Sequence, residues 1–161
     1  MGDALRVHSV TVCLDRVDVV VKVDDVGALK TVPSAGVAER ALELLPGLAS
    51  HTCSTGDARS FIEEIADTEV PHLFEHVVLE LMAESGSPRD LLGETAWDFR
   101  RDGRGVFRVS LEYDDDLVCL GAVKSADRLM GYMLEGGDRP DIGAETARIA
   151  ALRNIPPYLP V

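Results

Sequence analysis

The segment from Thr68 to Gly86 constrains the fold most, because it is a helix with clear signals at both ends. Thr68 or Asp67 can cap its N-terminus, Pro71 fits the first turn, where its missing N–H costs little, and Gly86 ends the pattern. Its apolar residues recur at helical spacing: Leu73, Phe74, Val77, Val78, Leu81 and Met82. The spacing predicts a helix that packs this face against the core.

Two pairs of β-rich segments lie on either side of this helix in the sequence. Residues 7–14 alternate apolar and polar side chains, and residues 17–23 are nearly continuous in valine, so they predict a β-hairpin with a turn between them. Residues 95–100 and 106–113, joined by the turn at 102–105, predict a second hairpin. The strands therefore form a small antiparallel sheet.

The remaining segments are mostly helical. Their predicted elements are a helix over 34–45 capped by Ser34, a loop over 46–56, a short helix after Asp57, a helix from Asp115 or Asp116 to about 134, a helix over 142–153, and an extended tail over 154–161. No repeat or low-complexity linker interrupts the chain. The order β, β, α, α, α, β, β, α, α predicts a single α+β domain over residues 1–161.

The charge of the chain excludes one class of partner. Its 16 Lys and Arg residues against 28 Asp and Glu residues give a net charge of −12, which repels a phosphate backbone, so we expect no nucleic-acid partner. The longest apolar stretch, Val17–Val23, is interrupted by Asp18 and Lys22 and is too short to cross a membrane. We expect no membrane partner either, whereas a homo-oligomer stays open.

The cysteines indicate a reducing compartment. The chain has three, Cys13, Cys53 and Cys119, an odd number without CxxC spacing, and its first residues lack the pattern of a secretory signal. We therefore expect free thiols and a cytoplasmic location.

The run His72-Leu73-Phe74-Glu75-His76 is the one motif that carries chemistry. Residues four apart lie on the same face of a helix, so His72 and His76 can bind one divalent ion, and neutral imidazole is a favoured zinc ligand. Glu75 lies beside them, where its carboxylate can act as general base on water activated by the ion. The order HxxEH is the inverse of the HExxH zinc motif.

A catalytic zinc ion usually has three protein ligands. Glu80 is the predicted third ligand, because His72, His76 and Glu80 follow one another in steps of four. Other residues could supply this ligand after folding: Glu84, Glu94, Glu112, His51 or Cys53. Alternatively, Cys53 is a small buried thiol, and the histidines and glutamates only flank the apolar face of a solvated helix. Zinc suits the predicted donor set, and other divalent metals remain possible.

The order of these segments resembles the N-terminal domain of cyanophycin synthetases over about residues 5–135. The residues that carry the resemblance are Leu44–Leu48, His51–Ser54, Gly56, Phe61–Glu63, His72–Leu81, Gly93, Thr95, Val106–Val109, Glu112 and Tyr113. That resemblance implies a metallohydrolase fold like that of pitrilysin-type peptidases and S-ribosylhomocysteine lyase. It also implies His72 and His76 as metal ligands, Glu75 as the base, and Glu80 as the third ligand.

The resemblance implies a substrate too. Some members of the family cut cyanophycin, a poly-aspartate backbone with arginine side chains. The family tends to carry Gly-Arg-Thr-Arg where this chain has Gly93-Glu94-Thr95-Ala96. The synthetases continue into ATP-grasp and ligase domains, whereas this sequence ends at Val161, so we expect no synthetase activity from it.

Three hypotheses follow. The first is a metal-dependent hydrolase, a peptidase acting on a peptide or a polyamide such as cyanophycin-like material, with Arg or Lys side chains that a −12 surface would attract. The second is a non-catalytic peptide- or polymer-binding or assembly module that retains the fold. The third, a metal-dependent lyase acting on a small molecule, rests on fold-level resemblance alone.

Overall fold

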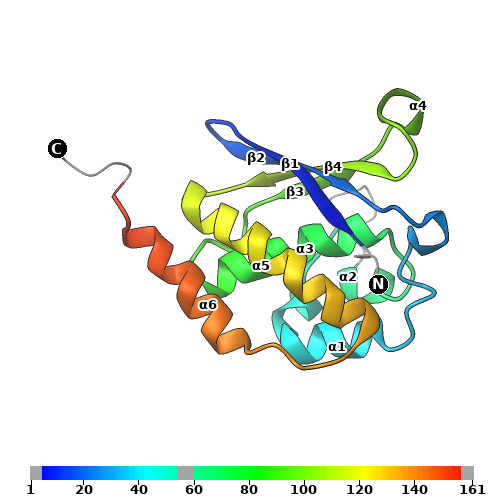
Figure 1. The fold of residues 1–161 in the computed structure, drawn as a ribbon. Helices are drawn as coiled ribbons and strands as arrows, with labels where there is room; N and C mark the ends of the chain where they lie inside the picture. Colours follow the sequence, from blue (N-terminus) through cyan, green and yellow to red (C-terminus); the bar gives the residue numbers. More distant parts are fainter. Residues whose placement is uncertain (1–4, 54–59, 157–161) are drawn as a thin grey trace.

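The computed structural model describes residues 5–53 and 60–156 and consists of two layers. One layer is a four-stranded antiparallel sheet in the order β1 (Arg6–Val12), β2 (Arg16–Lys22), β4 (Val106–Glu112) and β3 (Gly93–Ala96). The main helices gather on one face of this sheet (Figure 1). The α+β class and the pairing of β1 with β2 and of β3 with β4 are confirmed. The predicted strand 95–100 was wrong in its bounds, because β3 ends at Ala96 and Asp98 then caps a short helix over 99–102.

The centre of the sheet supplies its buried face. Val17, Val19 and Val21 of β2 are almost inaccessible to solvent, as their alternation with polar residues requires of a strand covered on one side. Strand β1 differs from the prediction of a half-buried strand, because Val10 and Val12 are 39% and 45% exposed. They pair with Val19 and Val17 but lie at the edge of the sheet, where the helical layer gives less cover.

The helical layer is built around α3 and α5, which pack against each other beneath the sheet. The helices are α1 (Val37–Leu44), α2 (Phe61–Glu64), α3 (Val70–Glu84), α4 (Phe99–Asp102), α5 (Asp116–Glu135) and α6 (Ile142–Ala151), with 3-10 turns η1 (Val26–Ala28), η2 (Pro46–Ser50) and η3 (Leu152–Asn154). None of the helices described is long and apolar enough to cross a membrane.

Several helix ends differ from those predicted. Helix α1 is capped by Gly36, whose φ of 81° no other residue type adopts readily, so the prediction of Ser34 was wrong. Glu69, in place of Thr68 or Asp67, precedes α3, and Pro71 lies in the first turn as predicted. Asp115 caps α5 as expected.

Some predictions concern residues outside the described part of the chain. They are the Asp57 cap, the matching residues Ser54 and Gly56, and most of the 154–161 tail; Ser60 precedes the short helix α2. The predicted loop 46–56 contains η2, which places His51 next to α3.

Candidate metal centre

Three potential metal ligands converge beside the buried part of α3. His72 and His76 lie one turn apart, with their Nε2 atoms 3.1 Å from each other. The Sγ atom of Cys53, which follows η2, lies 3.7 Å from Nε2 of His72 and 3.9 Å from Nε2 of His76. In the described part of the chain, these side chains form a group whose ligand atoms lie within 4.8 Å of one another.

The spacing of these atoms fits a tetrahedral zinc ion. Ordinary Zn–N and Zn–S bond lengths put two nitrogens about 3.3 Å apart, and a nitrogen and a sulfur about 3.6 Å apart, at tetrahedral angles. The separations in this cluster deviate from those values by only a few tenths of an ångström. Two imidazoles and one thiolate are also a donor set that suits zinc.

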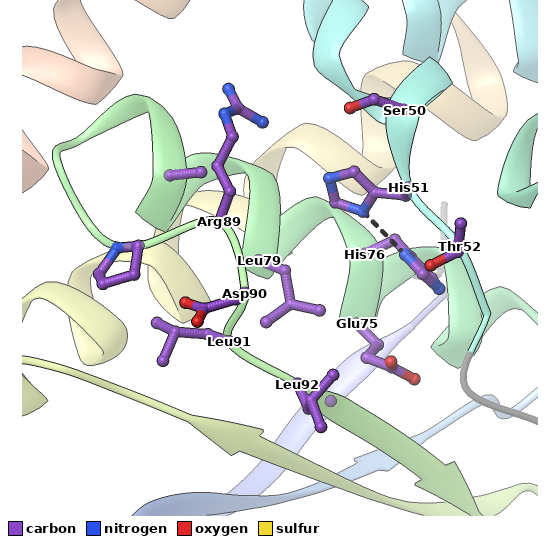
Figure 2. Close-up of a pocket in the computed structure, with 13 residues that line it drawn as sticks. Ser50, His51, Thr52, Glu75, His76, Leu79, Arg89, Asp90, Leu91 and Leu92 are labelled. Atoms are coloured by element: carbon purple, nitrogen blue, oxygen red, sulfur yellow. Dashed lines mark hydrogen bonds between the residues drawn. The ribbon is translucent and has the colours of Figure 1, made fainter.

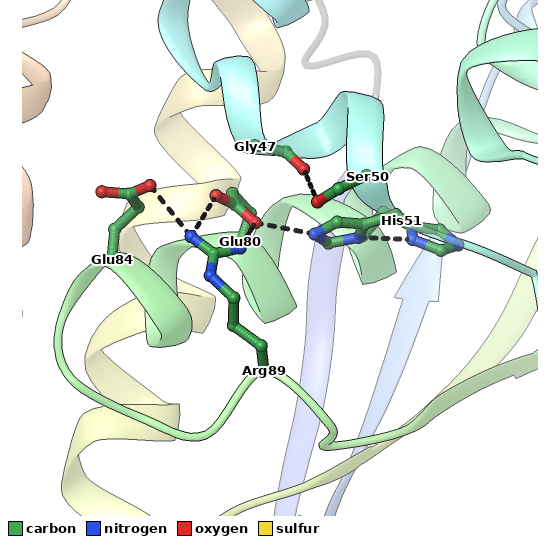
Figure 3. A network of polar contacts seen from close by, with 7 residues as sticks. Gly47, Ser50, His51, Glu80, Glu84 and Arg89 are labelled. Carbon is green, nitrogen blue, oxygen red and sulfur yellow. Dashed lines mark hydrogen bonds and ion pairs between the residues drawn. The ribbon is translucent and has the colours of Figure 1, made fainter.

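Glu80, the predicted third ligand, is not in this cluster. Its carboxylate is completely buried and accepts hydrogen bonds from Nε2 of His51, at 2.7 Å, and from the Arg89 guanidinium, at 3.0 and 3.2 Å (Figure 3). These bonds lower the pKa of Glu80 although burial alone would raise it. Glu80 does follow His76 by about one turn of α3, but its carboxylate is held by His51 and Arg89.

Both histidines are held through their second ring nitrogen. Nδ1 of His72 lies 2.7 Å from Oγ1 of Thr68, and Nδ1 of His76 lies 2.9 Å from Nδ1 of His51. The ring of Phe61 stacks on His76 with a centroid separation of 3.9 Å. Each Nε2 atom is thereby directed toward Cys53, which is the arrangement that metal-binding histidines need.

Burial sets the charge of these ligands. It lowers the pKa of His76 to about 2, and it lowers that of His72 despite the opposing effect of Glu64, so both imidazoles are neutral at pH 7. Burial, with a hydrogen bond to Glu64, raises the pKa of Cys53 to about 12. A bound cation would deprotonate this thiol, and the Glu64 carboxylate, 3.2 Å from Sγ, is placed to take the proton.

Glu75 lies between α3 and β3. The residue is only 5% exposed, and burial raises its pKa to about 7, against the hydrogen bond that Thr95 donates to Oε2 at 2.5 Å. Gly93 makes room for it, because a Cβ atom there would lie 2.8 Å from both Cγ and Oε1. A carboxylate with a pKa near 7 can both accept and donate a proton at neutral pH.

Two clefts meet at Glu75 and Gly93. The first, of about 330 Å³, runs between α3 and residues 88–93 and has His51 and His76 in its wall (Figure 2). The second, of about 390 Å³, includes Cys53 and His72 and is strongly acidic, with four further carboxylates at its rim: Glu64, Asp67, Glu69 and Glu94. The candidate centre is therefore reached from two sides.

Sequence reasoning missed the residues that enclose the motif. Thr68 and Thr95 hold His72 and Glu75, while Gly47 and Gly93 leave the space that Glu80 and Glu75 fill. A hydroxyl four residues before a helical histidine was a usable signal for Thr68. The other contacts join residues that only the fold brings together.

Within Gly93–Ala96, the two positions that match the family lie at the site and the two that differ do not contact Glu75 in this way. Gly93 and Thr95 match and contact Glu75, whereas Glu94 and Ala96 alternate with them on the exposed side of β3. The two positions that lack arginine are thus outside the ligand cluster, and Glu94 instead adds to the acidic cleft.

Two comparisons with known proteins identify the family of the chain. Residues 18–135 match the model of the cyanophycin synthase-like N-terminal domain. Cyanophycin synthetase from Crocosphaera subtropica is 32% identical to the chain over 102 residues, which are 62% of this chain but 11% of that protein. The chain thus matches only about a tenth of this relative's length. It belongs to the family of cyanophycin synthase-like N-terminal domains.

Proposed function

We propose that this chain is a metal-dependent hydrolase, with zinc as the preferred ion, that cleaves a peptide or polyamide. The observation that carries the proposal is the convergence of Cys53, His72 and His76 beside a cleft that Glu75, with its pKa raised to about 7 by burial, also lines. Cys53 replaces Glu80 as the third ligand in this proposal, because Glu80 is bound by His51 and Arg89.

The metal cluster, Glu75 and Thr95 would have different roles in hydrolysis. A divalent ion held by the cluster would supply Lewis-acid polarisation of the substrate carbonyl and of water. Glu75 would accept a proton from the attacking water and then donate it to the leaving nitrogen, so that the products are a carboxylic acid and an amine. Thr95 occupies Oε2, which leaves Oε1 for the water. A nearby cation would lower the pKa of Glu75 and favour its basic form.

The two clefts support a substrate that runs past the centre. A chain lying in both would have its scissile bond near Glu75, with segments extending to either side. The acidic cleft favours a cationic side chain, such as that of arginine or lysine, on the side of His72. Cyanophycin-like polyamide fits this description, as does an Arg- or Lys-bearing peptide. A cytoplasmic setting, which keeps Cys53 reduced, is part of the proposal.

Metal content and turnover together test the proposal. Protein purified without chelator is expected to hold about one zinc ion per chain in the wild type and in Glu75→Gln, and far less in His76→Ala and Cys53→Ala. Hydrolysis of cationic peptides should fall by about 10²- to 10⁴-fold in Glu75→Gln. Glu63→Gln, an exposed carboxylate of α2, is the matched control and should retain both properties.

The alternative outcomes are distinct. Equal and negligible metal in the wild type and both ligand variants would overturn the proposed centre. Saturable binding of the same peptides without cleavage would instead favour the binding-module hypothesis. Cleavage with full metal loading that is indifferent to Glu75→Gln would remove Glu75 as the base.

A further inference from the structure

A chain of hydrogen bonds connects the surface to His76 through the protein interior. It begins at the guanidinium of Arg89, which is 53% exposed, passes through the buried Glu80 carboxylate and reaches Nε2 of His51 (Figure 3). Nδ1 of His51 then lies 2.9 Å from Nδ1 of His76. No step of the proposed hydrolysis uses Arg89, Glu80 or His51.

The partners in this chain determine the position of each proton. Glu80, ionised beside Arg89, can only accept, so Nε2 of His51 must donate to it. In a neutral His51 the other nitrogen, Nδ1, is then an acceptor, and the proton in the contact with His76 belongs to Nδ1 of His76. The lone pair of His76 is left on Nε2, the atom that faces Cys53 and His72.

The surroundings keep this arrangement rigid. The side chain of Glu80 is inaccessible to solvent, and that of His51 is 13% exposed. Gly47 of η2 lies directly against Glu80, since a Cβ atom at position 47 would be 1.8 Å from Oε1. Glu80 therefore has little freedom to leave His51.

We propose that His51, anchored by Glu80 and Arg89, is a positioning residue that fixes His76 as the tautomer with its proton on Nδ1 and its lone pair on Nε2. The inference rests on the proposed function for its purpose, which is to present a ready ligand atom to the ion. Its physical content, the tautomer, belongs to the ion-free protein and is measured there. The role is general for metal-binding histidines, whose second nitrogen needs a fixed partner.

Long-range ¹H–¹⁵N correlation spectra of ion-free, ¹⁵N-labelled protein at pH 8 test the proposal directly. The wild type is expected to show His76 protonated on Nδ1 and His51 protonated on Nε2. In His51→Ala, His76 loses its acceptor and should shift toward the Nε2-protonated form that free imidazole prefers. A wild-type His76 protonated on Nε2, or a tautomer unchanged in His51→Ala, would overturn the proposal.

Two further variants separate positioning from a general loss of structure. His51→Asn places a carbonyl oxygen near the position of Nδ1 and is expected to restore the Nδ1-protonated form of His76. Thr68→Val removes the partner of His72 and should leave the tautomer of His76 unchanged. Failure of His51→Asn to restore the tautomer, in a protein with wild-type circular dichroism, would count against the proposal.

Zinc affinity, measured by competition with a chromogenic chelator, provides the second readout. His51→Ala should weaken binding by about 10- to 100-fold, and His51→Asn by less. A wild-type affinity in His51→Ala, despite a changed tautomer, would overturn the positioning role. If the wild type binds no zinc, the proposed function fails, and the tautomer spectra still decide whether His51 orients His76.

Discussion

The two histidines of the motif lie four residues apart on α3 but in different surroundings. His72 is half-buried beside the acidic cleft, and its Nδ1 atom contacts Thr68, just before the same helix. His76 is 3% exposed, stacks on Phe61 and contacts His51, which comes from another segment. The motif thus contains two histidines that the sequence does not distinguish, and the fold places one candidate ligand at the rim of the site and the other at its floor.

This difference shows where the rigidity of the centre comes from. The support of His72 is short and local, because a single hydroxyl bonds it and that hydroxyl lies 3.4 Å from Glu69. The support of His76 runs through the partly buried His51 and the fully buried Glu80 to a surface arginine. Perturbations of the second support should therefore affect both stability and metal binding more than matched perturbations of the first.

The largest expected effect is on the pH dependence of ion-free stability. Unfolded histidine takes up a proton near pH 6.5, but folded His76 stays neutral to about pH 2, so this group costs about 2 kcal/mol of stability between pH 7 and pH 5. Glu75 changes the free energy of unfolding in the opposite direction. Its folded pKa of about 7 exceeds the unfolded value, so protonation adds about 2 kcal/mol over the same range.

Variants at the two positions should separate these opposing contributions. With chelator present, urea unfolding should show that Glu75→Gln loses stability from pH 7 to pH 5, whereas His76→Gln gains it. His72→Gln should change the pH dependence less than His76→Gln, because His72 is less buried. Equal behaviour of the two histidine variants would remove the distinction between rim and floor.

A smaller effect is expected from one carboxylate in each support, Glu80 and Glu69. Glu80→Gln should lower the free energy of unfolding by about 1–2 kcal/mol, because a fully buried, charge-assisted set of hydrogen bonds is weakened. Glu69→Gln, its partly exposed counterpart, should stay within about 0.5 kcal/mol of the wild type. Urea unfolding of both variants at pH 7 measures the difference, and a larger loss in Glu69→Gln would contradict the comparison.

The smallest effect concerns the local support itself. Thr68→Val keeps the shape of the side chain but removes the hydroxyl that contacts His72, so zinc affinity should fall about fivefold, the equivalent of one hydrogen bond. Chelator competition measures it, with the exposed Thr11→Val of strand β1 as the control. A loss larger than that caused by His51→Ala would mean that the rim ligand, and not the floor ligand, depends more on its support.

Much of the fold could be predicted because its signals are local. Valine-rich β2 and the punctuated helix α3 follow from periodicity and end signals, and so do their positions in an antiparallel sheet and a helical layer. The exposure of Val10 and Val12 was not predictable, because alternation shows which face a side chain takes but not whether a helix covers that face.

In the candidate site, too, the positions set by local sequence could be predicted, whereas those set by tertiary contacts could not. His72, Glu75 and His76 were found from spacing alone, since a helix fixes their relative positions. The same rule points to Glu80 as the third member of the cluster, whereas the structure brings Cys53, one of the alternatives from the sequence, there from beyond η2. Helical spacing says which side chains share a face, but a partner such as His51 or Arg89 decides where a long carboxylate side chain points.

The close contact between Gly47 and Glu80 makes substitutions at these two distant positions depend on each other. Any side chain at position 47 would occupy the space of the Glu80 carboxylate, and a smaller residue at position 80 would leave that space empty. Over generations, chains with this centre are therefore expected to keep both residues or to replace both. Among sequences that contain the HxxEH motif, those with both Gly47 and Glu80 are therefore the ones in which we expect a histidine at position 51 to be held by hydrogen bonding to Glu80.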